Sequence, residues 1–113
     1  MPNYFLEEEF SVIFITCPTS EEARTIARVL VEERLAACVS VMPDNFSIYQ
    51  WHNEFFEHTE AKLMIKTRSA LFEKISERVK ELHSFVVPEI IELRITNASK
   101  EYKMWLSDET DIA

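Results

Sequence analysis

The two longest predicted strands of this chain follow one another between positions 36 and 67 and fold back on each other as a hairpin. The first run, Ala36 to Trp51, is rich in Val, Ile, Phe, Tyr and Trp, and Pro43-Asp44-Asn45 is its only interruption. The second run, Phe55 to Thr67, ends on a strict alternation, and the intervening His52-Asn53-Glu54 predicts a turn. Such strands span roughly 40–50 Å, whereas a globule of this chain length has a radius of gyration of about 13 Å. Because the hairpin is too long for its own domain to cover, we expect an oligomer.

A strand and a helix are predicted before the hairpin. Phe10 to Cys17 is an almost continuous apolar run with β-branched residues, which is typical of a strand buried on both faces. Thr19 then begins a capping box with Glu22, and apolar residues at helical spacing predict a helix through Arg34. Within the hairpin itself, Pro43 cannot donate to a strand ladder, so it indicates a bulge, a bend or an edge.

A helix, a strand and a short final helix are predicted after the hairpin. Ser69 is the expected N-cap of the second helix, and the segment His83 to Pro88 is expected to end that helix, because Pro88 favours an extended Val87. Glu89 to Ile95 alternates again, and we expect its isoleucine and leucine side chains to point inward, namely Ile91, Leu93 and Ile95. Asn97 or Ser99 opens the third helix.

This order of elements, β-α-β-β-α-β with a terminal helix, predicts an α+β fold of the ferredoxin-like split βαβ type with a long protruding β-hairpin. Residues 1–113 are expected to form a single domain, since 47% hydrophobic residues suffice for one core in a chain of this length. Within it, residues 1–9 are expected to be a flexible N-terminal extension. The terminal helix and neighbouring subunits would cover the remaining sheet face, which favours a closed ring.

The charge and composition exclude several classes of function. A formal net charge of −8, from 12 basic and 20 acidic residues, argues against nucleic acid as a partner. The stretch from Met1 to Phe10 contains no basic residue, which argues against a secretory signal, and no apolar run approaches the roughly 20 residues of a membrane helix. Cys17 and Cys38 lack CxxC spacing, so we expect reduced thiols and a cytoplasmic location.

The sequence contains no glycine. This excludes the glycine-rich loops that cradle nucleotide phosphates. It also predicts that asparagine occupies the backbone positions with positive φ, above all Asn53 in the hairpin turn. No motif for nucleophilic or metalloprotease catalysis is present, and we expect the protein not to be an enzyme.

Cys38 and His83 are the candidate metal ligands that residue chemistry alone indicates, because thiolate and imidazole suit copper and imidazole also suits zinc. Cys38 is equally well interpreted as a small buried hydrophobe. A second group of candidates could line a ligand site at a subunit cleft: Tyr49, Trp51, Lys66 and Glu89. For the two aromatic residues the alternative is an interface anchor, and for the charged pair it is an ordinary surface ion pair.

Several stretches resemble the CutA divalent-cation tolerance family. They are LVEERLAACVSV at Leu30–Val41, SIYQW at Ser47–Trp51, Lys66-Thr67, His83, Val87-Pro88-Glu89-Ile90, and Tyr102 with Trp105-Leu106. The resemblance implies a ferredoxin-like homotrimer whose hairpins embrace the neighbouring subunit, and a role in tolerance of divalent cations, especially copper. It also implies a similarity in assembly to the trimeric PII signalling proteins. The alternative function is therefore a PII-like signalling or scaffold module that binds a small ligand at its subunit clefts.

The resemblance further implies a copper site made by a cysteine near the end of the first strand and a histidine before a proline-tyrosine pair. In this chain Cys17 lies in that neighbourhood, although it is offset along the strand, and His83 is the histidine. The usual His-Pro-Tyr reads His83-Ser84-Phe85, and Asp44 stands where the family usually has glycine. The predicted metal ligands are thus Cys17 or Cys38 together with His83, with copper as the expected ion and other divalent cations allowed.

Overall fold

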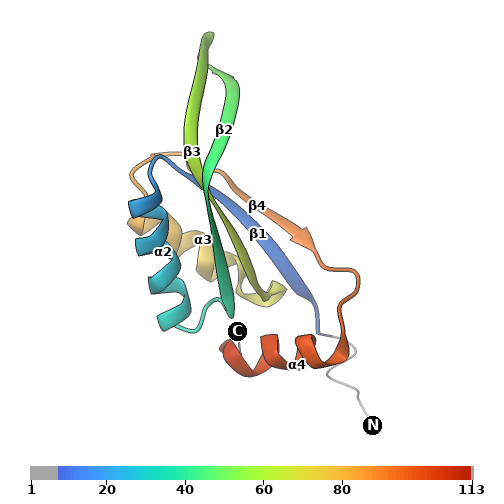
Figure 1. Ribbon diagram of the computed structural model, residues 1–113. Helices are drawn as coiled ribbons and strands as arrows, with labels where there is room; N and C mark the ends of the chain where they lie inside the picture. The colour runs from blue at the N-terminus through green and yellow to red at the C-terminus, as the bar shows by residue number, and fades with distance from the viewer. Residues whose placement is uncertain (1–7, 113) are drawn as a thin grey trace.

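The computed structural model describes residues 8–112, whose strands pair in the order β2-β3-β1-β4 with every neighbouring pair antiparallel. In chain order the elements are β1 (Phe10–Cys17), α2 (Ser20–Glu32), β2 (Cys38–Trp51), β3 (Glu54–Arg68), the 3-10 helix η1 (Ser69–Leu71), α3 (Phe72–Leu82), β4 (Ile90–Arg94) and α4 (Lys100–Glu109). This is the predicted ferredoxin-like α+β fold with a C-terminal helix (Figure 1). Residues 1–7 of the expected N-terminal extension lie outside the described residues. No helix of the described part has the length and apolar character needed to cross a membrane.

The hairpin of β2 and β3 divides into two halves at a β-bulge. The register shifts between Met42 and Asn45, where Pro43 removes a ladder donor, so the predicted interruption is confirmed as a bulge. We call positions 38–42 with 62–66 the covered half, and positions 45–51 with 54–60 the projecting half. The projecting half extends beyond the rest of the molecule as an arm (Figure 1), and the chain measures 56 × 25 × 22 Å.

The arm ends in a two-residue turn made by His52 and Asn53. Their φ angles are 50° and 66°, so both residues occupy the left-handed region, as a type I′ hairpin turn requires. The predicted positive φ of Asn53 is confirmed. Glu54, which we had expected in the turn, is already the first residue of β3.

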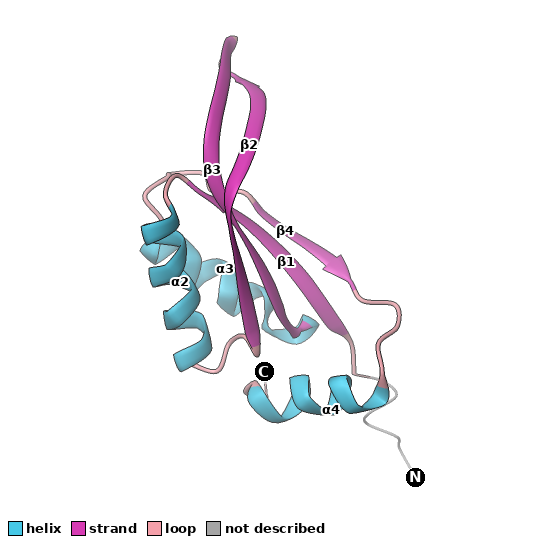
Figure 2. Cartoon of the chain, in the orientation of Figure 1, coloured by secondary structure: helices cyan, strands magenta, loops and turns pink. Residues whose placement is uncertain are grey.

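The hydrophobic core lies between one face of the sheet and the helices α2 and α3 (Figure 2). Alternate residues of β1 and β3 point into it, among them Ile13, Ile15, Leu63 and Ile65, each fully buried. The predicted cap of α2 is confirmed, because the Glu22 N–H donates to Thr19 Oγ1 at 3.1 Å. The helix ends at Glu32 and not at the expected Arg34, whose φ of 59° breaks the helical path.

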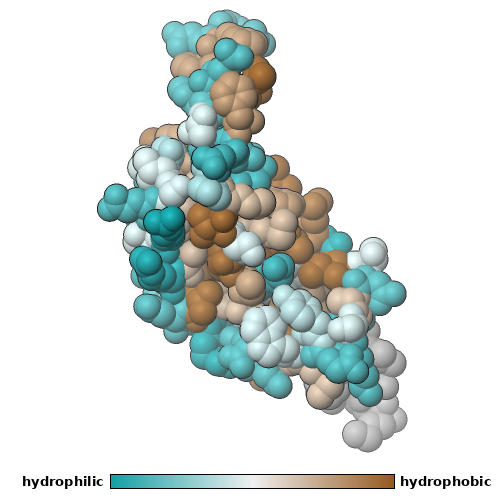
Figure 3. Space-filling view, viewed as in Figure 1, coloured by the Kyte–Doolittle hydropathy of each residue, from teal (hydrophilic) through white to brown (hydrophobic). Residues whose placement is uncertain are grey.

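In the described residues, no main helix covers the opposite sheet face, which exposes apolar side chains. The expectation that Ile91 and Leu93 point inward is wrong: they are 49% and 53% exposed. The pairing of β4 with β1 places Ile90 opposite Ile15, so Ile90 shares the core face and its neighbour Ile91 does not. Figure 3 shows apolar surface across the middle of the molecule and again on the arm. The sheet therefore presents a second apolar face that residues 8–112 leave exposed.

The helix α4 lies across the foot of the sheet, at the end away from the arm (Figure 1). Ser99 caps it, since the Tyr102 N–H donates to Ser99 Oγ at 3.2 Å. The guanidinium of Arg68 donates to the Ser107 carbonyl at 2.6 Å and to Thr110 Oγ1 at 2.9 Å. Arg34 donates to the Asp108 carbonyl at 2.6 Å. Arg68, the last residue of β3, and Arg34, which follows α2, thus fix the position of α4.

Candidate metal centre

His83 follows the last residue of α3, and its ring is buried against the end of β1. The ring Nε2 lies 2.8 Å from the Thr16 carbonyl oxygen, which can only accept, so Nε2 carries the proton and donates it. The remaining ring nitrogen, Nδ1, accepts from the Phe85 N–H at 3.0 Å. Metal-binding histidines commonly donate their other ring N–H to a backbone carbonyl, which fixes the tautomer and the ring orientation. His83 is therefore held in the tautomer whose Nδ1 carries a lone pair. This lone pair can bind a metal ion if the hydrogen bond from the Phe85 N–H opens.

Cys17 is the last residue of β1 and is fully buried. Burial first, and then the carboxylates of Glu22 and Glu60, raise the pKa of its thiol from 9.0 to about 12. The thiol is therefore protonated at neutral pH. A buried, protonated thiol is a poor nucleophile, but it becomes a strong ligand when a metal ion displaces its proton.

Glu22 is a candidate site residue that the sequence alone does not indicate. The sequence predicts it only as the acidic partner of a capping box, in which its carboxylate would reach back to the start of the helix. In the structure the carboxylate accepts from the Ser84 N–H at 3.2 Å instead, and its Oε2 lies 3.5 Å from His83 Nδ1. No spacing motif signals this role, because the contact joins the start of α2 to the segment after α3.

Cys17, Glu22 and His83 form one cluster in which a sulfur, an oxygen and a nitrogen atom all lie within 4.8 Å of one another. Metal–ligand bonds to these atoms are about 2.0–2.3 Å, so a tetrahedral ion needs its ligands roughly 3.3–3.8 Å apart. The Glu22–His83 separation already meets this requirement, and a side-chain movement of about 1 Å brings the full set to it. The three residues fit a small transition-metal ion.

Cys38 lies outside this cluster. Its partner across the ladder is Lys66, whereas the partner of Cys17 is Ala61, and these two positions of β3 are separated by roughly 17 Å along the strand. The Cys38 sulfur lies 3.8 Å from Lys66 Nζ. Of the two predicted combinations with His83, the structure brings together the one with Cys17 and not the one with Cys38.

The four predicted cleft residues do not meet within one chain. Tyr49 and Trp51 belong to the projecting half, where Tyr49 stacks on Phe56 with ring centroids 5.3 Å apart. Lys66 belongs to the covered half. Glu89 pairs with Lys62 at 3.7 Å rather than with Lys66, and its Oε2 is buried without a hydrogen-bond partner. A cleft that used all four side chains would need residues from more than one subunit, so the cleft stays a prediction.

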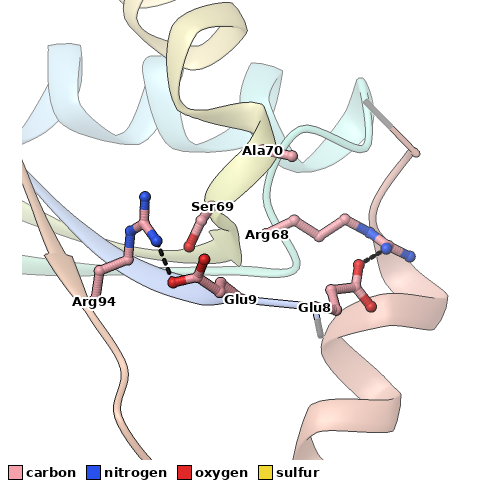
Figure 4. Close-up of a pocket in the computed structure, with 6 residues that line it drawn as sticks. All are labelled: Glu8, Glu9, Arg68, Ser69, Ala70 and Arg94. Atoms are coloured by element: carbon pink, nitrogen blue, oxygen red, sulfur yellow. Dashed lines mark hydrogen bonds and ion pairs between the residues drawn. The ribbon is translucent and has the colours of Figure 1, made fainter. Parts of the chain in front are cut away.

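A hollow of about 330 Å³ at the foot of the molecule is lined by charged side chains (Figure 4). Figure 4 shows that Arg68 pairs with Glu8 and that Arg94 pairs with Glu9. Ser69 and Ala70 complete the lining. Because both guanidinium groups are matched by carboxylates of the same chain, their charge is already neutralised, and the hollow does not compete with the cluster as a functional site.

The fold and the cluster together define a small ferredoxin-like protein with a projecting hairpin and a cluster of three side chains of the types that can ligate a metal ion. The chain belongs to the CutA1 divalent ion tolerance family, whose model, described as "CutA1 divalent ion tolerance protein", matches residues 11–109.

Two relatives illustrate how far the similarity extends along the chain. The divalent-cation tolerance protein CutA of Thermus thermophilus is 50% identical over 99 residues, which cover 88% of this chain and 96% of the relative. A CutA homolog of Xenopus laevis is 41% identical over 104 residues, which cover 92% of this chain and 69% of the relative.

Solved structures agree with the fold. The Thermus thermophilus divalent cation tolerance protein has a TM-score of 0.87 at 49% identity and covers 90% of this chain and 99% of its own. CutA1 from Oryza sativa has a TM-score of 0.90 at 34% identity and covers 93% of this chain and 96% of its own. The structure of a CutA from Archaeoglobus fulgidus, at 35% identity, carries the word periplasmic in its name, and a relative from Arabidopsis thaliana is named chloroplastic.

Proposed function

We propose that this protein is a homotrimeric metal-ion response protein that binds copper, or another divalent cation, through Cys17 and His83. The observation that carries the proposal is the convergence of these two side chains, with Glu22, inside 4.8 Å. They come from positions that are 66 residues apart in the sequence (17 and 83), so local chain geometry alone does not bring them together. Membership of a family named for divalent-ion tolerance supports the same conclusion.

The side chains around the cluster prepare it for an incoming cation. The Thr16 carbonyl holds the His83 ring in the tautomer that leaves Nδ1 unprotonated, and the start of α2 favours negative charge at Glu22. A bound cation would supply the positive charge that makes a thiolate stable in a buried place. Binding therefore releases the Cys17 proton, and affinity should rise with pH.

The projecting half of the hairpin supports the trimeric part of the proposal. Its large apolar side chains stay exposed in the single chain: Phe46 at 60%, Ile48 at 58%, Trp51 at 51% and Phe55 at 66%. By the register of β2 and β3, Phe46, Ile48 and Phe55 lie on one face of the arm, and exposed apolar groups gathered in this way are typical of an interaction surface. In a closed ring, each arm would lie on a neighbouring subunit, so the apolar side chains of every arm would be buried equally.

The role we propose is binding rather than catalysis. The relatives are named for cation tolerance and not for a reaction. The raised pKa of the Cys17 thiol and its burial disfavour a Cys–His nucleophile. The two free cysteines fit a reducing compartment, so we propose the cytoplasm as the location.

The experiment is a titration of four proteins with Cu⁺ under anaerobic conditions at moderate salt: the wild type, Cys17→Ser, His83→Ala and Cys38→Ser. Each is first shown to have the wild-type mass in solution. We expect the first two variants to lose at least tenfold in affinity, and Cys38→Ser, the matched control, to bind like the wild type. If all four bind alike, or none binds above the salt-sensitive background of an acidic protein, these residues are packing groups.

The alternative is a PII-like module that binds a small anionic ligand at subunit clefts through Tyr49, Trp51, Lys66 and Glu89. The observation that favours it is Glu89 Oε2, which is buried without a hydrogen-bond partner among the described residues and could accept from a donor group of such a ligand, beside the Lys62 ammonium at 3.7 Å. A ligand that binds only the native state raises its melting temperature. The alternative would be favoured over the proposed function if anionic metabolites raise the melting temperature of the wild type and of Cys17→Ser, and metal ions do not raise it.

A further inference from the structure

We propose that Glu22 is the third protein ligand of the centre, and that the resulting sulfur, nitrogen and oxygen set matches a divalent ion such as Zn²⁺ better than Cu⁺. This inference rests on the proposed binding at Cys17 and His83. It adds a ligand and a class of ion to that proposal.

The first argument is the contact between two acceptors. Glu22 Oε2 lies 3.5 Å from His83 Nδ1, and the N–H of the neutral ring, at Nε2, is committed to the Thr16 carbonyl. A carboxylate oxygen and an unprotonated ring nitrogen therefore face each other. Such an arrangement is unfavourable unless a proton or a cation lies between the two atoms.

The segment after α3 supplies the second argument. The Ser84 and Phe85 N–H groups each donate to one of the facing acceptors, Glu22 Oε2 at 3.2 Å and His83 Nδ1 at 3.0 Å. These donors hold the two ligand atoms near each other without a metal. A cation at Nδ1 must displace the Phe85 N–H, because one lone pair cannot serve both. Phe85 is 44% exposed and Val86 is 96% exposed, so this segment has room to move away.

Charge balance selects the ion. The Cys17 thiolate and the Glu22 carboxylate together carry two negative charges, which a divalent cation neutralises and a monovalent cation does not. The Cys17 and His83 side chains are fully buried and that of Glu22 is 21% exposed, so a residual negative charge would be costly.

Ligand chemistry points the same way. Cu⁺ prefers soft thiolate and thioether ligands, whereas Zn²⁺ accepts cysteine, histidine and carboxylate ligands in tetrahedral geometry. Three protein ligands leave the fourth position for water or an exogenous ligand, as in open zinc sites. The geometry points to a divalent-ion centre in which Glu22 sets the preference.

The test compares Glu22→Gln with the control Glu21→Gln, which removes the same charge from the neighbouring position of α2. Both variants keep the backbone N–H of position 22, which donates to Thr19 Oγ1, so the N-cap of α2 is retained. Affinities for Zn²⁺ and, anaerobically, Cu⁺ are measured by competition with chelators of known affinity. Co²⁺ serves as a spectroscopic probe, because its thiolate charge-transfer band reports a Co–sulfur bond independently of affinity.

We expect Glu22→Gln to weaken Zn²⁺ binding by tenfold or more and Cu⁺ binding by less than threefold, while Glu21→Gln changes neither by more than threefold. Glu22→Asp, which keeps the charge on a shorter side chain, should lose less Zn²⁺ affinity than Glu22→Gln and serves if the latter fails to fold. Binding of Co²⁺ should also abolish the protection of the Phe85 N–H against hydrogen exchange.

Equal losses for Zn²⁺ and Cu⁺, or no loss for either ion, would overturn the role of Glu22. If Cys17→Ser and His83→Ala reduce Zn²⁺ binding and Glu22→Gln does not, this inference fails and the proposed function stands. If none of the three variants differs from the wild type, the proposed function fails as well.

Discussion

The two halves of the β2–β3 hairpin both consist of long paired strands, but their surroundings are opposite. In the covered half, Leu63 and Ile65 are fully buried under α2 and α3. In the projecting half, Phe46 and Phe55 are 60% and 66% exposed. The covered half relies on aliphatic residues and the projecting half on aromatic ones, and both kinds favour strands, so strand propensity does not distinguish the two halves. The comparison shows that strand-forming apolar residues make a core where helices cover the sheet and leave an exposed apolar surface where they do not.

The largest difference between the halves should appear on truncation of one side chain in each. Leu63→Ala removes a fully buried side chain and leaves a cavity, so we expect a loss of about 2–5 kcal/mol in the free energy of unfolding. Phe55→Ala in a chain kept monomeric by dilution should change it by less than about 0.5 kcal/mol. Urea unfolding measures both. Equal losses would mean that the arm packs against its own domain.

The second prediction concerns assembly. Trp51 is half-exposed in the single chain and lies next to the tip of the arm, where a large aromatic side chain is a typical interface anchor. Trp51→Ala should weaken subunit association by about 2 kcal/mol or more, or roughly 30-fold in dissociation constant. The control Glu32→Ala changes an exposed residue of α2. A dissociation constant that is unchanged in both variants would make Trp51 peripheral to the interface.

The turn at the end of the arm gives a smaller effect. Asn53 has a φ of 66°, which a β-branched residue adopts only with strain. Asn53→Val should therefore cost about 1–2 kcal/mol in thermal or urea unfolding, whereas Asn53→Gly should be neutral or mildly stabilising. Equal melting temperatures for wild type and Asn53→Val would contradict the turn geometry.

The stability of the protein at alkaline pH tests the burial of the Cys17 thiol, at the end of β1. The pKa of Cys17 is about 12 in the folded chain and 9.0 when exposed, so the folded state holds its proton more tightly. The stabilisation that follows is complete below pH 9 and is lost as pH rises from 9 to 12. At pH 10 the wild type should have lost about 1.4 kcal/mol more than Cys17→Ser, each relative to pH 8. Parallel stability curves for the two proteins would show that water reaches this thiol.

Local pattern was sufficient to predict most of the fold. The bulge at Pro43, the cap at Thr19 and the positive φ of Asn53 each follow from the chemistry of one residue, and each is confirmed. The face of β4 was not predictable in this way. Ile91 and Leu93 alternate correctly, but only the register with β1 decides which face meets the helices.

The candidate site was predictable only in part. The chemistry of Cys17 and His83 made them candidates, and the fold brings them together. Cys38 was an equally good ligand by residue type, but the ladder places it beside Lys66 at another level of the sheet. Glu22 was explained fully by its local role as a helix-capping residue, so its approach to His83 depends on tertiary structure alone.

The mass of the protein in solution tests most directly whether other copies of the chain cover the projecting half. Light scattering at low micromolar concentration should give three times the chain mass of 13.3 kDa, and Trp51→Ala should shift that value toward one chain mass on dilution. A stable wild-type monomer of 13.3 kDa under the same conditions would contradict the account.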